Sequence, residues 1–176
     1  MKITAFVTLI IALSLSSCGQ KPAATMSNNN QTTKSNIMST ENNDSTQVNK
    51  TEAEWKNALS PDQYRVLREK GTDAPFTGKY YLNKDKGVYV CAACGNELFT
   101  SDMKFESSCG WPSFDKEIAG GKIKTIIDTS HGMVRTEIVC ARCGSHLGHL
   151  FDDGPTPTGE RYCVNSTSLN FKKEEK

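Results

Sequence analysis

The stretch "GVYVCAACG" at residues 87–95 runs from a predicted β-strand into a Cys-x-x-Cys-Gly turn, and "EIVCARCG" at residues 137–144 repeats this arrangement. Two cysteines at this spacing can point their sulfur atoms at one spot, so two such turns supply a tetrahedral set of metal ligands. The sequence therefore predicts one structural zinc ion bound by Cys91, Cys94, Cys140 and Cys143. Each pair could instead form a disulfide or a redox motif, although the βαβ context typical of thioredoxin-like motifs is missing.

Short runs with β-strand character lie on both sides of these turns. Residues 78–82 ("GKYYL") and 87–91 flank "NKDK", which is typical of a hairpin. Residues 124–130 and 133–140 flank "HG", which indicates a second hairpin. The run "RYCVNSTSLNF", residues 161–171, is predicted as a final strand.

Two short helices are predicted ahead of the strands. Thr51 and Glu54 form a capping-box pattern, Ser60 before a proline starts a second helix, and Gly71 ends it. Because helices lead and strands follow without βαβ alternation, we expect a mainly β or α+β domain over residues 51–176.

The N-terminal segment has the pattern of an export signal. Residues 1–17 carry a positive charge at Lys2 and an apolar run too short to span a bilayer. They run into "LSSC", which resembles a bacterial lipobox and predicts cleavage before Cys18 and lipid attachment to its sulfur. An ordinary signal peptide that happens to end at a cysteine is the alternative. Residues 18–50 are rich in Asn, Ser and Thr and are expected to form a disordered linker. We therefore expect an exported lipoprotein anchored to a bacterial membrane, at its periplasmic or outer face.

The charges of the chain are balanced. It has 21 Lys and Arg against 20 Asp and Glu, for a formal net charge of +1. Nucleic-acid binding requires a basic excess that this composition lacks, so no nucleic-acid partner is expected. A hydrophobic content of 36% fits one soluble domain.

Two of the seven cysteines, Cys109 and Cys163, belong to neither the lipobox nor the paired turns. In an exported protein they could form a structural disulfide. In a strand, however, Arg161, Cys163 and Asn165 share one face, and a neighbouring guanidinium favours the nucleophilic thiolate. Cys109 lies in the loop-like "SSCGWPSF", where a mobile second thiol would be placed. The residues alone leave both interpretations open.

Histidine and aromatic residues near these cysteines are candidates for a pocket. His146 and His149 can move protons near neutral pH, and Asp153 can orient them. Each histidine could also be a buried structural residue or a metal ligand. Trp111 and Phe114 are large enough to wall an apolar group, although such residues more often belong to the core.

Longer motifs carry a resemblance to a known family. "PFTGKYY", "GVYVCAACG", "SSCGWPSF", "SHGMVRTE" and "CARCGSHLGHLFDDGPTPTGERYCVNSTSLNF", in this order, resemble the B-type methionine sulfoxide reductases, the peptide-methionine (R)-S-oxide reductases. The likeness covers about residues 52–171. It implies two antiparallel sheets with short N-terminal helices. It also implies an oxidoreductase that repairs one epimer of methionine sulfoxide in oxidised proteins or peptides.

The resemblance implies a role for each matching residue. Cys163 corresponds to the catalytic nucleophile, Cys109 to the resolving cysteine and Trp111 to the residue that packs against the substrate's methyl group. The polar lining would comprise His146, His149, Asp153, Arg161 and Asn165, and the paired cysteines would bind zinc. In this mechanism His149 protonates the leaving oxygen, and a thioredoxin-like donor reduces the resulting disulfide.

Two other classes of protein remain possible at this point. A zinc-knuckle binding module without catalysis would leave Cys163 no more reactive than an ordinary thiol. A different thiol enzyme, such as a peroxidase or a disulfide exchanger, would turn over peroxides or disulfides faster than sulfoxides. Both stay open because a fold does not fix a function.

Overall fold

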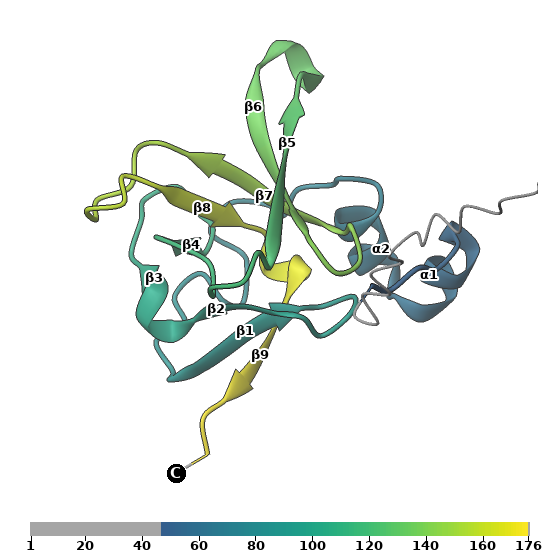
Figure 1. Cartoon of the computed structure of the whole chain (residues 1–176), viewed down its shortest axis with the longest axis horizontal. Helices are drawn as coiled ribbons and strands as arrows, with labels where there is room; N and C mark the ends of the chain where they lie inside the picture. Colours follow the sequence, from purple (N-terminus) through teal and green to yellow (C-terminus); the bar gives the residue numbers. More distant parts are fainter. Residues whose placement is uncertain (1–46, 176) are drawn as a thin grey trace, which may run out of the picture. The chain divides into compact units, whose positions relative to one another are not determined.

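The structure, a computed structural model, describes residues 47–175 and consists of two antiparallel sheets preceded by two short helices (Figure 1). The smaller sheet has the strand order β2-β1-β9, and the larger has the order β3-β4-β8-β7-β6-β5. The strands are β1 (Gly87–Cys91), β2 (Glu97–Thr100), β3 (Lys104–Phe105), β4 (Ser113–Phe114), β5 (Ile123–Asp128), β6 (Arg135–Cys140), β7 (His146–Phe151), β8 (Arg161–Val164) and β9 (Leu169–Lys173). Every strand pairing within the described residues is antiparallel, which confirms the predicted fold class.

The two helices begin where the sequence predicts. They are α1 (Glu52–Ala58) and α2 (Pro61–Leu67). Each starts with a capping box, formed by Thr51 with Glu54 before α1 and by Ser60 with Gln63 before α2. Helix α2 ends before the predicted stop at Gly71, whose N–H donates back to a carbonyl inside the helix at 2.8 Å.

The part of the chain that the structure describes begins before residue 51. The N–H of Val48 donates to the carbonyl of Arg142 at 2.8 Å, and Nε2 of Gln47 donates to the carbonyl of Ala141 at 3.0 Å. Gln47 and Val48, which the sequence analysis placed in the linker, therefore contact the second Cys-x-x-Cys turn.

The remaining N-terminal predictions lie outside the described residues. These are the signal peptide at residues 1–17, lipidated Cys18 and the linker up to residue 46. Among the residues that the structure does describe, no helix is both long and apolar enough to cross a membrane.

The first predicted hairpin does not form. Strand β1 pairs with β2 and β9, while residues 78–82 adopt turns. The reason is a close contact with the chain's C-terminal part, since a Cβ on Gly78 would lie 2.2 Å from Oγ of Ser166. The N–H of Tyr80 donates to the same hydroxyl at 3.2 Å. Residues 78–82 therefore contact the C-terminal part of the chain through backbone groups that would otherwise pair with a neighbouring strand.

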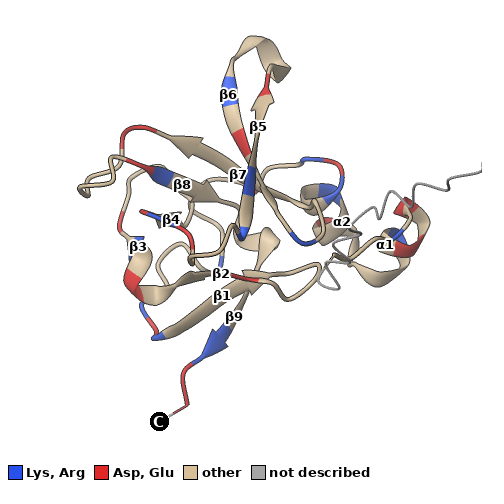
Figure 2. Ribbon diagram, viewed as in Figure 1, with Lys and Arg blue, Asp and Glu red and all other residues tan. Residues whose placement is uncertain are grey.

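The second predicted hairpin is confirmed. Strands β5 and β6 pair continuously from Ile123 opposite Cys140 to Asp128 opposite Arg135. The hairpin projects from the larger sheet in Figure 1, and Figure 2 marks an acidic position of β5 and a basic position of β6 near its free end. Asp128 ends β5 and Arg135 begins β6, and their side chains form an ion pair at 2.7 Å.

The predicted final strand is divided into two. The N–H of Asn165 donates to the carbonyl of Leu147 at 2.9 Å, and a 3-10 turn, Ser166–Ser168, follows. Strand β8 therefore belongs to the larger sheet and β9 to the smaller one. This turn carries the chain from one sheet to the other.

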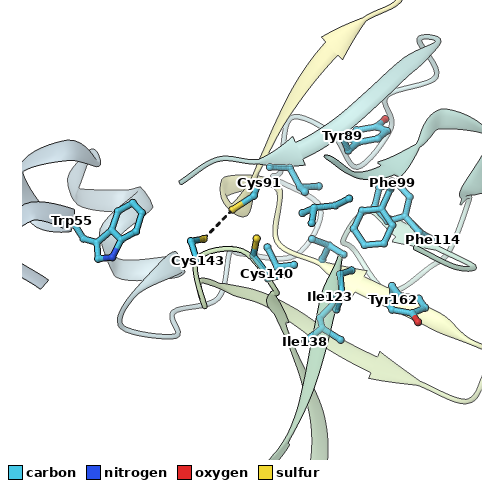
Figure 3. Packing of buried hydrophobic residues seen from close by; sticks show 14 residues of the cluster. Trp55, Tyr89, Cys91, Phe99, Phe114, Ile123, Ile138, Cys140, Cys143 and Tyr162 are labelled. Carbon is cyan, nitrogen blue, oxygen red and sulfur yellow. Dashed lines mark hydrogen bonds between the residues drawn. The ribbon is translucent and has the colours of Figure 1, made fainter. Parts of the chain in front are cut away.

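Aromatic side chains from both sheets form the core (Figure 3). The rings of Phe99 on β2 and Phe114 on β4 stack with centroids 4.1 Å apart, and Tyr89 on β1 meets Phe114 edge-on at 5.0 Å. Tyr162 on β8 completes the group, 5.9 Å from Phe99. These contacts hold the two sheets together behind the strand that carries Cys163.

Candidate active site

A small cavity lies beside β6, β7 and β8 and the loop that precedes β4. Its volume is about 110 Å³, and it is lined by Thr72, Trp111, Arg135, Gly148, His149, Phe151, Cys163 and Asn165. This volume suits one side chain, because pockets for drug-sized ligands are roughly 300–1,000 Å³. Four of the site residues predicted from the sequence line this cavity: Trp111, His149, Cys163 and Asn165.

Strand pairing brings the two unpaired cysteines together. Cys163 of β8 lies opposite Ser113 of β4, so the loop that carries Cys109 packs against β8 and the two sulfur atoms are 3.7 Å apart. On the other side of β8, the backbone of β7 packs tightly against Cys163, since a Cβ on Gly148 would lie 2.0 Å from the carbonyl oxygen of Cys163. A disulfide bond of about 2.05 Å is therefore within reach of small side-chain movements.

Of the two thiols, Cys109 is the one whose pKa is lowered. Hydrogen bonds from Cys163, Ser107 and Ser113 lower the pKa of Cys109 to about 4, although partial burial opposes this. The contact with Cys109, together with burial, raises the pKa of Cys163, and Arg161 opposes this only in part. The guanidinium of Arg161 lowers the pKa of Cys163, as expected, but in the reduced pair the sulfur of Cys109 has the larger effect.

Arg161 is held by an acidic residue from the adjacent loop. Its Nε and Nη2 donate to the two carboxylate oxygens of Asp153 at 2.7 and 2.9 Å, and its guanidinium lies 4.3 Å from the ring centroid of Phe151. Arg161 shares a face of β8 with Cys163, as predicted for residues two apart in a strand. Asp153 orients Arg161 and not a histidine, which corrects the role expected for it.

His149 is instead oriented by Asp128, which the sequence analysis did not nominate. Nε2 of His149 lies 2.8 Å from Oδ2 of Asp128, and Nη2 of Arg135 donates to the same oxygen at 2.7 Å. Hydrogen bonds from Ser130 in the first place, and then from His149 and Arg135, hold the pKa of Asp128 well below its usual range. The predicted hairpin of β5 and β6 was the sequence signal that could have pointed to Asp128, because its register places Asp128 opposite Arg135.

His146 lies behind His149 and does not line the cavity. It is buried, its Nδ1 is 2.8 Å from Oε1 of Glu137, and burial lowers its pKa. Lys70 donates to the other oxygen of Glu137 at 2.7 Å. The rings of His146 and His149 meet edge-on at 5.6 Å. His146 can therefore act on the cavity only through its neighbour.

The backbone of Asp73 holds two walls of the cavity. Nε1 of Trp111 donates to the carbonyl of Asp73 at 3.0 Å, and the N–H of Asp73 donates to Oδ1 of Asn165 at 3.0 Å. Asn165 also donates to the carbonyl of Leu147 at 3.3 Å, so its amide is engaged by the backbone on both sides. The prediction that Phe114 lines the pocket is wrong, because its ring is fully buried in the aromatic core.

The four paired cysteines form a candidate metal centre. The sulfur atoms of Cys91, Cys94, Cys140 and Cys143 all lie within 4.8 Å of one another. The separation is 3.7 Å between Cys91 and Cys143 and 3.6 Å between Cys94 and Cys140. A tetrahedral ion with metal–sulfur bonds of about 2.3 Å requires sulfur–sulfur distances of about 3.8 Å, so the geometry fits such an ion. Figure 3 shows three of these cysteines converging beside Trp55 of α1.

This centre joins the two sheets at a distance from the cavity. Cys91 ends β1 and Cys140 ends β6, and in both turns the glycine N–H closes back on the first cysteine's carbonyl at 2.8 Å. Arg135 lies at the opposite end of β6, about 17 Å away along an extended strand. A metal bound by the cysteines would therefore support the fold and stay clear of the cavity.

These features agree with a match to a protein family. The SelR domain matches residues 59–173, and the chain belongs to that family. A relative from Methanosarcina barkeri, named peptide methionine sulfoxide reductase MsrB, is 63% identical over 128 residues, which are 73% of this chain and 90% of that protein. Proteins of the same name from Methanosarcina mazei and Leptospira interrogans are each 59% identical over 128 residues, covering 73% of this chain and 91% and 98% of their own lengths. The resemblance inferred from the motifs is confirmed.

Proposed function

We propose that this chain reduces methionine (R)-S-oxide in oxidised proteins and peptides, with Cys163 as nucleophile and Cys109 as resolving cysteine. The observation that carries the proposal is the 3.7 Å separation of these sulfur atoms at a cavity sized for one side chain. Membership of the SelR family and the shared name of the relatives support the same reaction.

The cavity has an apolar and a polar side for a methionine sulfoxide. The rings of Trp111 and Phe151 supply surfaces against which the S-methyl group can pack. His149 and Arg135 supply the N–H groups that can donate to the sulfoxide oxygen. Fixing the methyl group and the oxygen on opposite sides leaves one arrangement about the sulfur, which selects one epimer.

The first step transfers oxygen from the substrate to Cys163. Its sulfur attacks the sulfoxide sulfur and forms an S–S bond. The oxygen then passes from the substrate sulfur to the sulfur of Cys163 as the S–S bond breaks, and the products are methionine and a Cys163 sulfenic acid. The thiol gives up two electrons, and its proton ends on the transferred oxygen. His149, held by Asp128, is the group that we assign to carry this proton.

The second step forms a disulfide between the two cysteines. The thiolate of Cys109 attacks the sulfenic sulfur of Cys163, and the hydroxyl leaves as water after taking up a proton. A thioredoxin-like dithiol then reduces the disulfide by thiol exchange, which restores both cysteines and oxidises the donor.

We assign zinc to the four-cysteine centre. Four thiolates in a tetrahedral arrangement are typical of structural zinc sites, in which the protein occupies every coordination position. Bound there, the ion would hold the end of β1 against the end of β6.

We further propose that the enzyme works outside the cytoplasm as a lipoprotein anchored through Cys18. This rests on the lipobox-like "LSSC" that follows the apolar run near the N-terminus. Mass spectrometry of the N-terminal peptide from membranes would test it. An N-terminal Cys18 carrying acyl chains is expected, and an unmodified peptide would contradict the anchor.

The reaction is tested with the full chain and the two separated epimers of dabsylated methionine sulfoxide, with dithiothreitol as reductant. Loss of the R epimer alone is expected. Loss of the S epimer would overturn the predicted stereochemistry, and turnover of neither epimer by the reduced, zinc-loaded protein would overturn the proposed reaction.

A further inference from the structure

Two serine hydroxyls surround the sulfur of Cys109. Oγ of Ser107 lies 3.0 Å from this sulfur, and Oγ of Ser113 lies 3.4 Å from it. The two hydroxyl oxygens are 2.7 Å apart, and Cys163 approaches the same sulfur at 3.7 Å. Neither serine lines the cavity, and Ser113 is almost fully buried.

We propose that Ser107 and Ser113 are positioning residues that keep Cys109 deprotonated and aimed at Cys163, so that the sulfenic acid is resolved quickly. The inference rests on the function proposed above. It assigns the serines to the disulfide-forming step and leaves the reduction of methionine sulfoxide to the groups that line the cavity.

The hydroxyl protons allow this arrangement. Ser113 can donate to the carbonyl of Trp111 at 3.2 Å or to Ser107 at 2.7 Å, and in either case the proton of Ser107 can point along the shorter contact to the sulfur. A thiolate at Cys109 accepts such a proton, whereas a thiol would direct its own hydrogen to the carbonyl of Trp111 at 3.5 Å. Hydrogen bonding to the charged form favours that form, and the lowered pKa of Cys109 has the direction that this geometry requires.

The charged groups around the pair do not by themselves account for the lowered pKa of Cys109. Arg161 is the cation on β8 beside the two cysteines, and its guanidinium is paired with the carboxylate of Asp153 through two hydrogen bonds. His149 lies across the cavity and is joined to Asp128. The two hydroxyls are therefore the nearest groups that stabilise a negative sulfur, apart from Cys163 itself.

The position of the serines also explains the direction of attack. Ser113 is paired with Cys163 across the β4–β8 ladder, so the hydroxyl that helps to hold Cys109 is anchored beside its target. During resolution the Cys109 thiolate forms the S–S bond, the S–O bond of the Cys163 sulfenic acid breaks, and the hydroxide takes a proton to become water. A resolving cysteine that is already deprotonated needs no base at this step.

The test uses single turnovers of the reduced full chain with methionine (R)-S-oxide and without external reductant. Methionine release reports the first step, and dimedone labelling of Cys163, followed by mass spectrometry, reports how long the sulfenic acid persists. Both are measured across pH for the wild-type chain and for Ser107→Ala and Ser113→Ala. The exposed Ser108 takes no part in the hydrogen bonds around the sulfur, so Ser108→Ala is the matched control.

The two alanine variants should release methionine at the wild-type rate but resolve the sulfenic acid more slowly at pH values below the midpoint of resolution. We expect the pH midpoint of resolution to rise by about one unit, which slows resolution about tenfold on the acidic side of the midpoint. Ser107→Thr keeps the hydroxyl and should restore the wild-type midpoint, while Ser108→Ala should leave it unchanged.

Three outcomes separate the possibilities. Unchanged resolution in Ser107→Ala and Ser113→Ala would overturn this inference and leave the proposed function intact. Failure of the wild-type chain to release methionine would overturn the proposed function itself. If Ser113→Ala does not fold, Ser107→Ala, on a partly exposed loop residue, still decides the matter.

Discussion

Asp128 and His149, 21 residues apart in the sequence, are joined by a 2.8 Å contact between Oδ2 and Nε2. Because the same oxygen accepts from Arg135, the carboxylate stays fixed against the ring. If Nε2 carries the hydrogen of this bond, Nδ1 is the ring nitrogen left to exchange a proton. The β5–β6 hairpin thus orients the ring of a histidine on β7.

Asp128→Asn should therefore damage catalysis without unfolding the protein. An amide lacks the charge that stabilises a protonated ring, and its NH2 group can turn toward Nε2 and reverse the tautomer, so we expect kcat for methionine (R)-S-oxide to fall about 100-fold. Initial rates with dithiothreitol would measure this. Asp152→Asn, which removes the same charge from an exposed position, is the control and should retain wild-type kcat. Equal losses in both variants would show that the effect is only one of surface charge.

Cys163→Ser should abolish turnover. The hydroxyl of serine is a far weaker nucleophile than a thiol and cannot form a sulfenic acid, so we expect activity to fall at least about 10³-fold. Metal content and melting temperature should stay close to those of the wild type, because this side chain is not part of the four-cysteine centre. Normal activity in this variant would refute the assignment of the nucleophile.

Cys109→Ser should separate the first step from the recycling step. Without the resolving thiol, each chain should release about one equivalent of methionine and then stop when thioredoxin is the only reductant. Counting methionine per chain in the presence and absence of thioredoxin measures both quantities. Sustained thioredoxin-driven turnover would mean that another cysteine resolves the sulfenic acid.

The thiol pair should react with iodoacetamide over an unusual pH range. The pKa of Cys109 lies at about 4, well below the ordinary thiol value of 9.0, so its thiolate is present at neutral pH and is lost only as the pH falls through this value. Alkylation of Cys109, followed by peptide mass spectrometry, should therefore be nearly constant between about pH 6 and pH 9. Cys163→Ala removes the largest cause of the shift and should move the curve to higher pH. A wild-type rate that rises about tenfold per pH unit over this range would contradict the assignment.

Local sequence signals predicted much of the fold correctly. The capping box of Thr51, the helix start at Ser60 and the β5–β6 hairpin depend on neighbours within a few residues, and all three appear in the structure. The first hairpin failed because Gly78 is held against Ser166, a residue that lies far along the chain. The division of the last strand at Asn165 likewise depends on a hydrogen bond to Leu147. Long-range contacts of this kind leave no local pattern.

The site was harder to predict because its residues depend on strand register. His146 and His149 are three positions apart, so in a regular strand they would point to opposite faces. The register of β6 and β7 shifts between Ile138 and Val139, which adds one residue to β7 and brings both rings to one side. The sequence named the histidines, but only the bulge and the neighbouring hairpin show that Asp128 and Glu137 are their partners.

Cys91→Ser should remove the metal and destabilise the whole domain. Cys91 ends β1 and its sulfur lies 3.7 Å from that of Cys143, so the substitution breaks the link between the smaller and the larger sheet. Because the binding energy of a structural zinc site contributes to folding, we expect the melting temperature to fall by roughly 10 °C or more. Metal analysis of the purified chain and thermal unfolding measure the two effects, and Cys163→Ser is the matched cysteine control. Unchanged metal content would refute the site, and a chain that loses zinc but melts at the wild-type temperature would show that the two sheets hold together without it.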